Sequence, residues 1–209
     1  MKKQNNLQTA LTTVRQQIEK PKSCEELARP LQMAISETKE RYGDSTNFLN
    51  VFNPDTQIFA SKNLDRAYLG TAPTLTTVSH TYGYDVLEVW IMAQLENLND
   101  FCGASVKMEI LQMAELAKII FSEYHFLKAS ELLLFFYCFK SGEYGHFYGS
   151  IDPQKITVAL LEFKKQRIAD IKYYESRKEN EEKNRLREEW AKECVSREEY
   201  EKMKKSKKL

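Results

Sequence analysis

Side chains that could do chemistry are sparse in this 209-residue chain, and they are widely spaced. The three histidines, His80, His125 and His146, lie 45 and 21 positions apart. Glu143 and His146 have the Glu-x-x-His spacing of di-iron helical bundles, but such a site needs a second copy of the motif and further carboxylates. This single pair lies among glycines, so we expect no metal there.

Other signatures of catalysis are missing from the sequence. Cys24, Cys102, Cys138 and Cys194 include no CxxC pair and no compact set of metal ligands, so we expect four reduced thiols. No segment matches the phosphate-binding patterns G-x-x-x-x-G-K-[ST] and G-x-G-x-x-G, or the G-x-S-x-G pattern of serine hydrolases. We therefore expect a non-enzymatic protein with no cofactor and no metal. The alternative is a small enzyme whose titratable groups converge from distant segments.

The most unusual segment is FKSGEYGHFYGSIDP, residues 139–153, which we call the aromatic–glycine loop. Its three glycines alternate with aromatic residues, and lysines flank it. Glycines let a partner approach the backbone closely, and aromatic rings beside cations can stack nucleic-acid bases. The candidate contacts for nucleic acid or another partner are Lys140, Tyr144, His146, Phe147, Tyr148, Lys155 and Arg167. The alternative is a tight connection between helices whose rings fold back onto the protein.

Charge is unevenly distributed along the chain. The total is +1, yet residues 164–209 hold 16 basic and 11 acidic residues, whereas residues 1–163 have a net charge of −4. A basic end can attract phosphates without reading any base. The alternative is a solvated terminal helix that ends in frayed lysines. The lysines that concentrate the excess are Lys202, Lys204, Lys205, Lys207 and Lys208.

Apolar periodicity predicts helices along most of the chain, and few strand patterns occur. Glycines that end a helix commonly take the left-handed conformation, and Gly43, Gly70, Gly83 and Gly103 each follow a periodic segment. The run LLLFFYCF, residues 132–139, is apolar all round, which is typical of a helix buried at the centre of a bundle.

Helix boundaries follow from polar residues beside these segments. We expect Ser105 and Ser130 to cap the helices that begin near them. Residues 44–59 contain Asn-Pro-Asp and no helical period, so we expect a loop there. A long helix is predicted after Asp152-Pro153, because aspartate favours the cap and proline the first helical position. Its core face is expected to contain Val158, Leu161, Ile168 and Ile171.

The end of the chain is predicted to be a helix without a core. Residues 175–185 contain no aliphatic or aromatic residue, but glutamates four residues before lysines or arginines support a helix. Leu186, Trp190 and Val195 form a short apolar patch, which is the candidate docking site of this tail. We therefore divide the chain into a helical bundle domain, residues 1–174, and a charged helical tail, residues 175–209.

Two stretches carry a family resemblance. LTTVSHTYGYDVLEVWIMAQLENLNDFCG, residues 75–103, and ELLLFFYCFKSGEYGHFYGSIDPQKITVALLEFKKQR, residues 131–167, resemble a family of uncharacterised proteins from Bacteroidetes genomes, mobile elements and their phages. Those relatives similarly place Tyr-Gly before a Trp-bearing helix, and an FKxGxYGxFYGxxDP-like segment before a long helix containing an arginine. The resemblance implies no activity. Carriage on mobile elements implies an accessory of replication or transfer, and the helicase loaders of phages are similar in size and all-α character, by analogy of fold.

These observations predict an all-α fold, a compact multi-helix bundle with a long, charged C-terminal helical extension. We expect a cytoplasmic protein, because no secretory signal is visible and the longest uncharged apolar run, eight residues, is too short to cross a bilayer. The leading hypothesis is a non-enzymatic adaptor or DNA-replication accessory, whose body binds a protein and whose loop or tail contacts nucleic acid. The alternative is a purely protein-binding or self-associating helical module.

Overall fold

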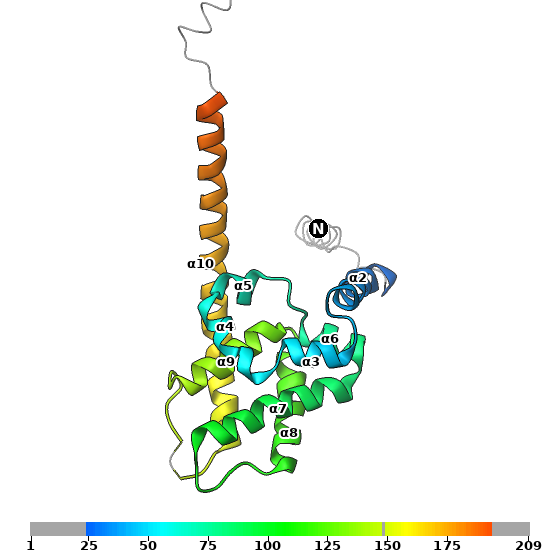
Figure 1. Ribbon diagram of the computed structural model, residues 1–209, viewed down its shortest axis with the longest axis vertical. Helices are drawn as coiled ribbons and strands as arrows, with labels where there is room; N and C mark the ends of the chain where they lie inside the picture. The colour runs from blue at the N-terminus through cyan, green and yellow to red at the C-terminus, as the bar shows by residue number, and fades with distance from the viewer. Residues whose placement is uncertain (1–23, 148, 194–209) are drawn as a thin grey trace, which may run out of the picture.

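The computed structural model describes residues 24–147 and 149–193, which form helices and no strand (Figure 1). The long last helix projects from a compact body, so the predicted all-α bundle with a C-terminal helical extension is confirmed. In chain order the elements are α2 (Cys24–Tyr42), α3 (Ser45–Val51), the 3-10 helix η1 (Pro54–Thr56), α4 (Gln57–Lys62), α5 (Leu64–Leu69), α6 (Leu75–Tyr82), α7 (Tyr84–Cys102), α8 (Ile110–Tyr124), α9 (Ala129–Lys140) and α10 (Pro153–Glu193).

Helix α9 forms the centre of the core, as its all-apolar sequence predicts. It contacts α4, α5, α7 and α10, and the side chains from Leu132 to Phe136 are all buried. Full burial of each such side chain contributes about 1.5–3 kcal/mol. Trp90 and Ile91 of α7 are also buried, so α7 and α9 supply much of the core.

The predicted loop at residues 44–59 is wrong, because α3, η1 and the start of α4 occupy it. The turn-forming residues act as helix caps instead. The Asp44 carboxylate accepts a hydrogen bond of 2.8 Å from the Asn47 backbone N–H, and Asn53 caps η1 in the same way. Phe48, on α3, is fully buried. Burial of its ring therefore stabilises a helix that is too short to be stable alone.

A buried polar contact holds this segment against α7. The Phe52 carbonyl accepts a 2.7 Å hydrogen bond from Trp90 Nε1 and a 3.2 Å bond from Gln94 Nε2. Gln57 Nε2 in turn donates to Gln94 Oε1 at 2.8 Å. Four buried polar groups are thus satisfied by one another, and they hold the segment between α3 and α4 against α7.

The predicted serine caps are also wrong. Helix α8 begins at Ile110, five residues after Ser105, with Glu109 as its cap. Helix α9 begins at Ala129, and the Glu131 carboxylate accepts a 2.9 Å hydrogen bond from the Lys128 backbone N–H. Ser130 instead donates to the Ala67 carbonyl at 2.7 Å, a contact that joins α9 to α5. A serine beside a helix start is used here for tertiary contact rather than for capping.

One of the four predicted helix-ending glycines also differs. Gly43, Gly83 and Gly103 have positive φ, whereas Gly70 has extended backbone with φ −68°. A Cβ at Gly70 would lie 2.2 Å from the Arg66 carbonyl oxygen, so close packing and not a left-handed turn requires glycine there.

Helix α10 begins as predicted, but its core face is different. Asp152 Oδ1 accepts a 2.8 Å hydrogen bond from the Gln154 N–H, which caps the helix at Pro153. The side chains of Val158, Leu161 and Ile168 are 64%, 48% and 54% exposed, so the expectation that they are buried is wrong, and Ile171 is only partly buried. The core face is formed by Ile156, Ala159, Leu160 and Phe163.

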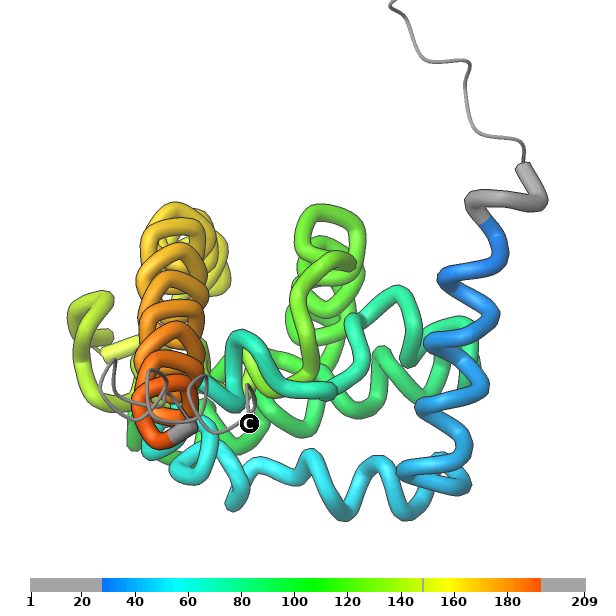
Figure 2. The backbone as a smooth tube through the Cα atoms, turned by 90° about the horizontal axis from the view of Figure 1, so that it is seen from above, coloured from blue at the N-terminus to red at the C-terminus, as the bar shows by residue number. Residues whose placement is uncertain are grey.

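Beyond the body, α10 continues as an exposed helix. The helix is unbroken at residue 174. The division of the chain into a bundle domain and a tail at that residue stays a prediction. The last ion pair with the body joins Arg177 to Asp65 of α5, and the described side chains from Lys178 onward are exposed. Seen from above, α10 and α2 lie at opposite ends of the body (Figure 2).

Candidate interaction surfaces

The aromatic–glycine loop joins α9 to α10 through glycines with left-handed backbone. Gly142 and Gly145 both have φ +89°, and the Gly145 N–H donates to the Gly142 carbonyl at 3.1 Å. A Cβ at Gly142 would also lie 3.1 Å from His146 Cε1. The glycines therefore serve a tight turn that other residues would strain.

Two rings of this loop pack on the core. Tyr144 stacks on Phe135 with ring centroids 5.7 Å apart, and Phe147 stacks on Phe139 at 5.3 Å. Burial raises the pKa of the Tyr144 hydroxyl. His146 is exposed, and Tyr148 lies outside the described residues. Base stacking needs free ring faces, and Tyr144 and Phe147 each use one face for the core.

The lysines at the two sides of the loop contact other groups of the protein. Lys140 donates to the Asn97 side chain and lies 5.5 Å from the centre of the Phe101 ring. Burial lowers the pKa of Lys140. Lys155 donates to the His146 carbonyl at 3.2 Å and lies 5.7 Å from the Phe147 ring. These contacts hold the loop together, and they compete with any phosphate for the same ammonium groups.

Arg167 contacts a buried carboxylate and not the aromatic–glycine loop. Its Nε donates to Glu131 Oε1 at 2.9 Å, and its guanidinium lies over the Phe126 ring at 5.4 Å. The Glu131 side chain is fully buried, and burial raises the pKa of its carboxyl, against the opposing effect of hydrogen bonds from Lys128 and Arg167. The pair joins α9 to α10 inside the protein.

Further polar groups extend this contact into a junction that sequence reasoning missed. The Tyr68 hydroxyl donates to Asp170 Oδ2 at 2.9 Å, and Lys128 Nζ donates to the Tyr68 and Gly70 carbonyls at 2.7 and 2.8 Å. The one sequence signal is Glu131 itself, an acidic residue directly before the apolar run at residues 132–139. Because these groups satisfy one another, the junction fixes α10 on the body. In the described ranges, no group of three His, Cys, Asp or Glu residues is placed to hold a metal ion.

The structure reveals exposed apolar side chains in two groups on one side of α10, at residues 158–168 and 186–190, with charged residues between the groups. Successive residues of a helix are rotated by about 100° around its axis, so these exposed apolar residues all lie within an arc of about 80°. This arc is roughly opposite the face that packs on the core. Of the predicted tail patch, Leu186 is 49% and Trp190 73% exposed, whereas Val195 and the terminal lysines lie outside the described residues. The two groups together, which we call the free face, consist of Val158, Leu161, Ile168, Leu186 and Trp190.

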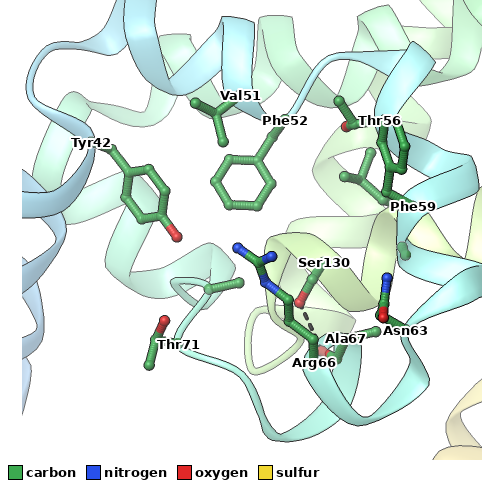
Figure 3. A pocket seen from close by; sticks show the side chains of 13 residues that line it. Tyr42, Val51, Phe52, Thr56, Phe59, Asn63, Arg66, Ala67, Thr71 and Ser130 are labelled. Atoms are coloured by element: carbon green, nitrogen blue, oxygen red, sulfur yellow. Dashed lines mark hydrogen bonds between the residues drawn. The ribbon is translucent and has the colours of Figure 1, made fainter.

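A separate cavity of about 300 Å³ opens between α3, α4, α5 and α9 (Figure 3). Phe52, Phe59 and Leu133 give it apolar walls. Arg66 extends its guanidinium into the space between Tyr42 and Phe52, and no described acidic side chain pairs with it. Such a cavity suits an apolar group that carries a negative charge.

No helix in the described part of the chain is long and apolar enough to span a bilayer.

Comparison with known proteins gives a match for the second half of the chain. No curated protein and no solved structure matches the chain. Residues 107–209, which contain α8, α9, the aromatic–glycine loop and α10 with its free face, match a family of unknown function, DUF6633.

Proposed function

We propose that this protein is a non-enzymatic helical adaptor, which binds an α-helix of a protein partner through the free face of α10. The observation that carries the proposal is the second apolar face of α10, where Leu161, Ile168, Leu186 and Trp190 are about half to three-quarters exposed. A helix that packs on a body needs only one apolar face. Tryptophan is among the residues that contribute most to protein–protein binding.

The construction of α10 supports this use. Its base is held by the Glu131–Arg167 pair and by the Tyr68–Asp170 hydrogen bond. Its projecting part carries side-chain ion pairs along the helix, including Lys183 with Glu179 at 3.5 Å and Arg185 with Glu182 at 2.7 Å. Each exposed pair contributes only about 0.3–0.5 kcal/mol, but together they favour a helix without core contacts. The second part of the free face, at Leu186 and Trp190, therefore lies on a continuous helix that projects from the body.

Affinity capture with the full-length chain tests the proposal. Trp190→Ala is expected to abolish the recovery of proteins that the wild type retains. Tyr173→Ala is the matched control, because Tyr173 is a 62% exposed aromatic residue of the same helix but lies off the free face. Equal recovery by Trp190→Ala and by the wild type would contradict the proposal.

A second candidate function is contact with nucleic acid, as an accessory of DNA replication or transfer. Lys165 and Lys172 on α10 are exposed, and neither has an acidic partner among the described side chains. The link to mobile elements and phages depends on the family resemblance alone. Fluorescence anisotropy with single- and double-stranded oligonucleotides at about 50 mM salt tests this function, since phosphate contacts are strong there. Binding that Lys165→Glu/Lys172→Glu weakens supports it, and the absence of binding contradicts it.

A further inference from the structure

The free face of α10 has the spacing of a coiled-coil seam. Two-stranded coiled coils use positions that recur at alternating steps of three and four residues. The apolar residues Val158, Leu161, Ile168 and Leu186 all fall on one such series, and the positions between them are charged. The complete series is Val158, Leu161, Lys165, Ile168, Lys172, Glu175, Glu179, Glu182 and Leu186.

Charge divides this seam into two halves of opposite sign. Its first half contains Lys165 and Lys172 and no acidic residue, whereas its second half contains Glu175, Glu179 and Glu182. All five of these side chains are exposed. Within the described part of the chain, neither lysine has an acidic partner. The seam therefore has unpaired positive charge at one end and glutamates at the other, where Glu179 and Glu182 also pair with Lys183 and Arg185 of their own helix.

From these two observations we propose that the partner helix is α10 of a second copy of this chain, paired antiparallel along the free face. The inference rests on the free face being a docking surface, as proposed above. In antiparallel register, position 173 of one copy lies opposite position 174 of the other. Leu161 then faces Leu186, Lys165 faces Glu182 and Lys172 faces Glu175. Each pair occurs twice, because the dimer has twofold symmetry.

Charge complementarity favours the antiparallel over the parallel arrangement. In a parallel pair each residue faces its own copy, so Lys165, Lys172, Glu175, Glu179 and Glu182 would all meet like charges. In the antiparallel pair both lysines meet glutamates, and apolar residues close the two ends, where Trp190 lies beside Val158. Two contacts lack complementarity, because Ile168 faces Glu179 and Val158 faces Glu189.

The contacts of α10 with the body use other residues than the seam. The residues that bind α10 to the body, such as Ile156, Leu160 and Phe163, lie on the face of the helix roughly opposite the seam. The two bodies therefore lie on the outer sides of the helix pair. The projecting half of each α10, beyond Arg177, covers the exposed Val158–Ile168 stripe of its partner.

Sedimentation equilibrium of the full-length chain, from micromolar to near-millimolar concentration, tests the pairing. The wild type is expected to form a concentration-dependent dimer. Lys165→Glu/Lys172→Glu and Glu175→Lys/Glu182→Lys are each expected to raise the dimer Kd by roughly tenfold or more, because every Lys–Glu pair becomes a like-charge pair. The variant with all four substitutions restores opposite charges only in antiparallel register. Its Kd is expected to return to within about threefold of the wild-type value.

Matched controls separate pairing from a general effect of charge. Lys178→Glu and Glu188→Lys make the same kinds of change at exposed positions of α10 that lie off the seam, and they are expected to leave the Kd unchanged. Circular dichroism checks that every variant keeps its helix content. A wild type that stays monomeric, or a fourfold variant as weak as the double variants, would overturn the inference.

The outcomes also distinguish this inference from the proposed function. A monomeric wild type that still captures partners through Trp190 overturns self-pairing alone. If Trp190→Ala alters neither capture nor self-association, the free face is not a docking surface and both proposals are wrong.

Discussion

Among the described residues, Arg167 is the one side chain that hydrogen-bonds the Glu131 carboxylate, so its replacement by methionine leaves this fully buried acid with the Lys128 backbone N–H alone. Losing one partner of a buried ion pair costs about 3–5 kcal/mol. The Arg167 side chain is itself 19% exposed, so water can reach the site. We therefore expect the free energy of unfolding to fall by about 3 kcal/mol, the lower end of this range. For a domain of this size, the melting temperature then falls by about 6–12 °C.

The loss is expected to depend on pH. Burial holds the pKa of Glu131 above its ordinary value, so the folded protein binds this proton more tightly than the unfolded chain does. Its contribution to stability is therefore greatest in acid and is lost as the pH rises through the folded-state pKa. Without Arg167 the pKa of Glu131 rises further. The loss of unfolding free energy in Arg167→Met, relative to the wild type, is therefore smaller at about pH 5 than at about pH 7.5.

Urea unfolding followed by circular dichroism at both pH values measures the effect. Arg185→Met is the matched control, because Arg185 pairs with Glu182 in an exposed position and its loss costs less than about 1 kcal/mol. Replacing both Glu131 and Arg167 by methionine is expected to recover part of the loss, since no buried charge then remains. An Arg167→Met variant as stable as Arg185→Met would refute the reasoning.

Three further predictions concern the fold. Trp90→Phe removes a donor to the Phe52 carbonyl and leaves a small cavity, so the free energy of unfolding should fall by about 2 kcal/mol; an unchanged urea midpoint by circular dichroism would contradict this. Gly145→Ala strains a backbone with φ +89° and should cost about 1 kcal/mol, and Gly142→Ala should cost at least as much because its Cβ also meets His146; thermal unfolding ranks the two. Burial raises the pKa of Cys138 to about 12, with Glu143 adding to the effect, so alkylation at about pH 8 should be slow until urea unfolds the protein. Mass spectrometry of the Cys138 peptide follows that reaction, and equal native and unfolded rates would count against burial.

Local signals in the sequence predicted much of this fold. Asp152 and Pro153 begin α10 as expected, since capping depends only on neighbouring residues. The apolar run at residues 132–139 similarly indicates a central helix. The loop predicted for residues 44–59 is wrong because Asp and Asn-Pro have the same preferences in loops and at helix starts. Only the tertiary burial of Phe48 decides between the two.

The interaction surfaces were harder to predict. Apolar residues occur on two sides of α10, and periodicity alone does not say which side meets the body. The prediction that Val158, Leu161 and Ile168 are buried is wrong for this reason. The partner of Arg167 lies 36 positions away in the sequence, at Glu131. Such a pairing depends on how α9 and α10 pack, which a single sequence does not encode locally. Aromatic composition likewise does not show that Tyr144 and Phe147 stack on Phe135 and Phe139.

The junction at the base of α10 also sets the position of its far end. Trp190 lies 23 residues beyond Arg167, which at 1.5 Å per residue is a lever arm of about 35 Å. A rotation of about 5° at the Glu131–Arg167 and Tyr68–Asp170 contacts displaces the Trp190 end by about 3 Å, comparable to the width of a side chain. The geometry of these contacts at the base of α10 therefore determines where the Trp190 end of the helix lies.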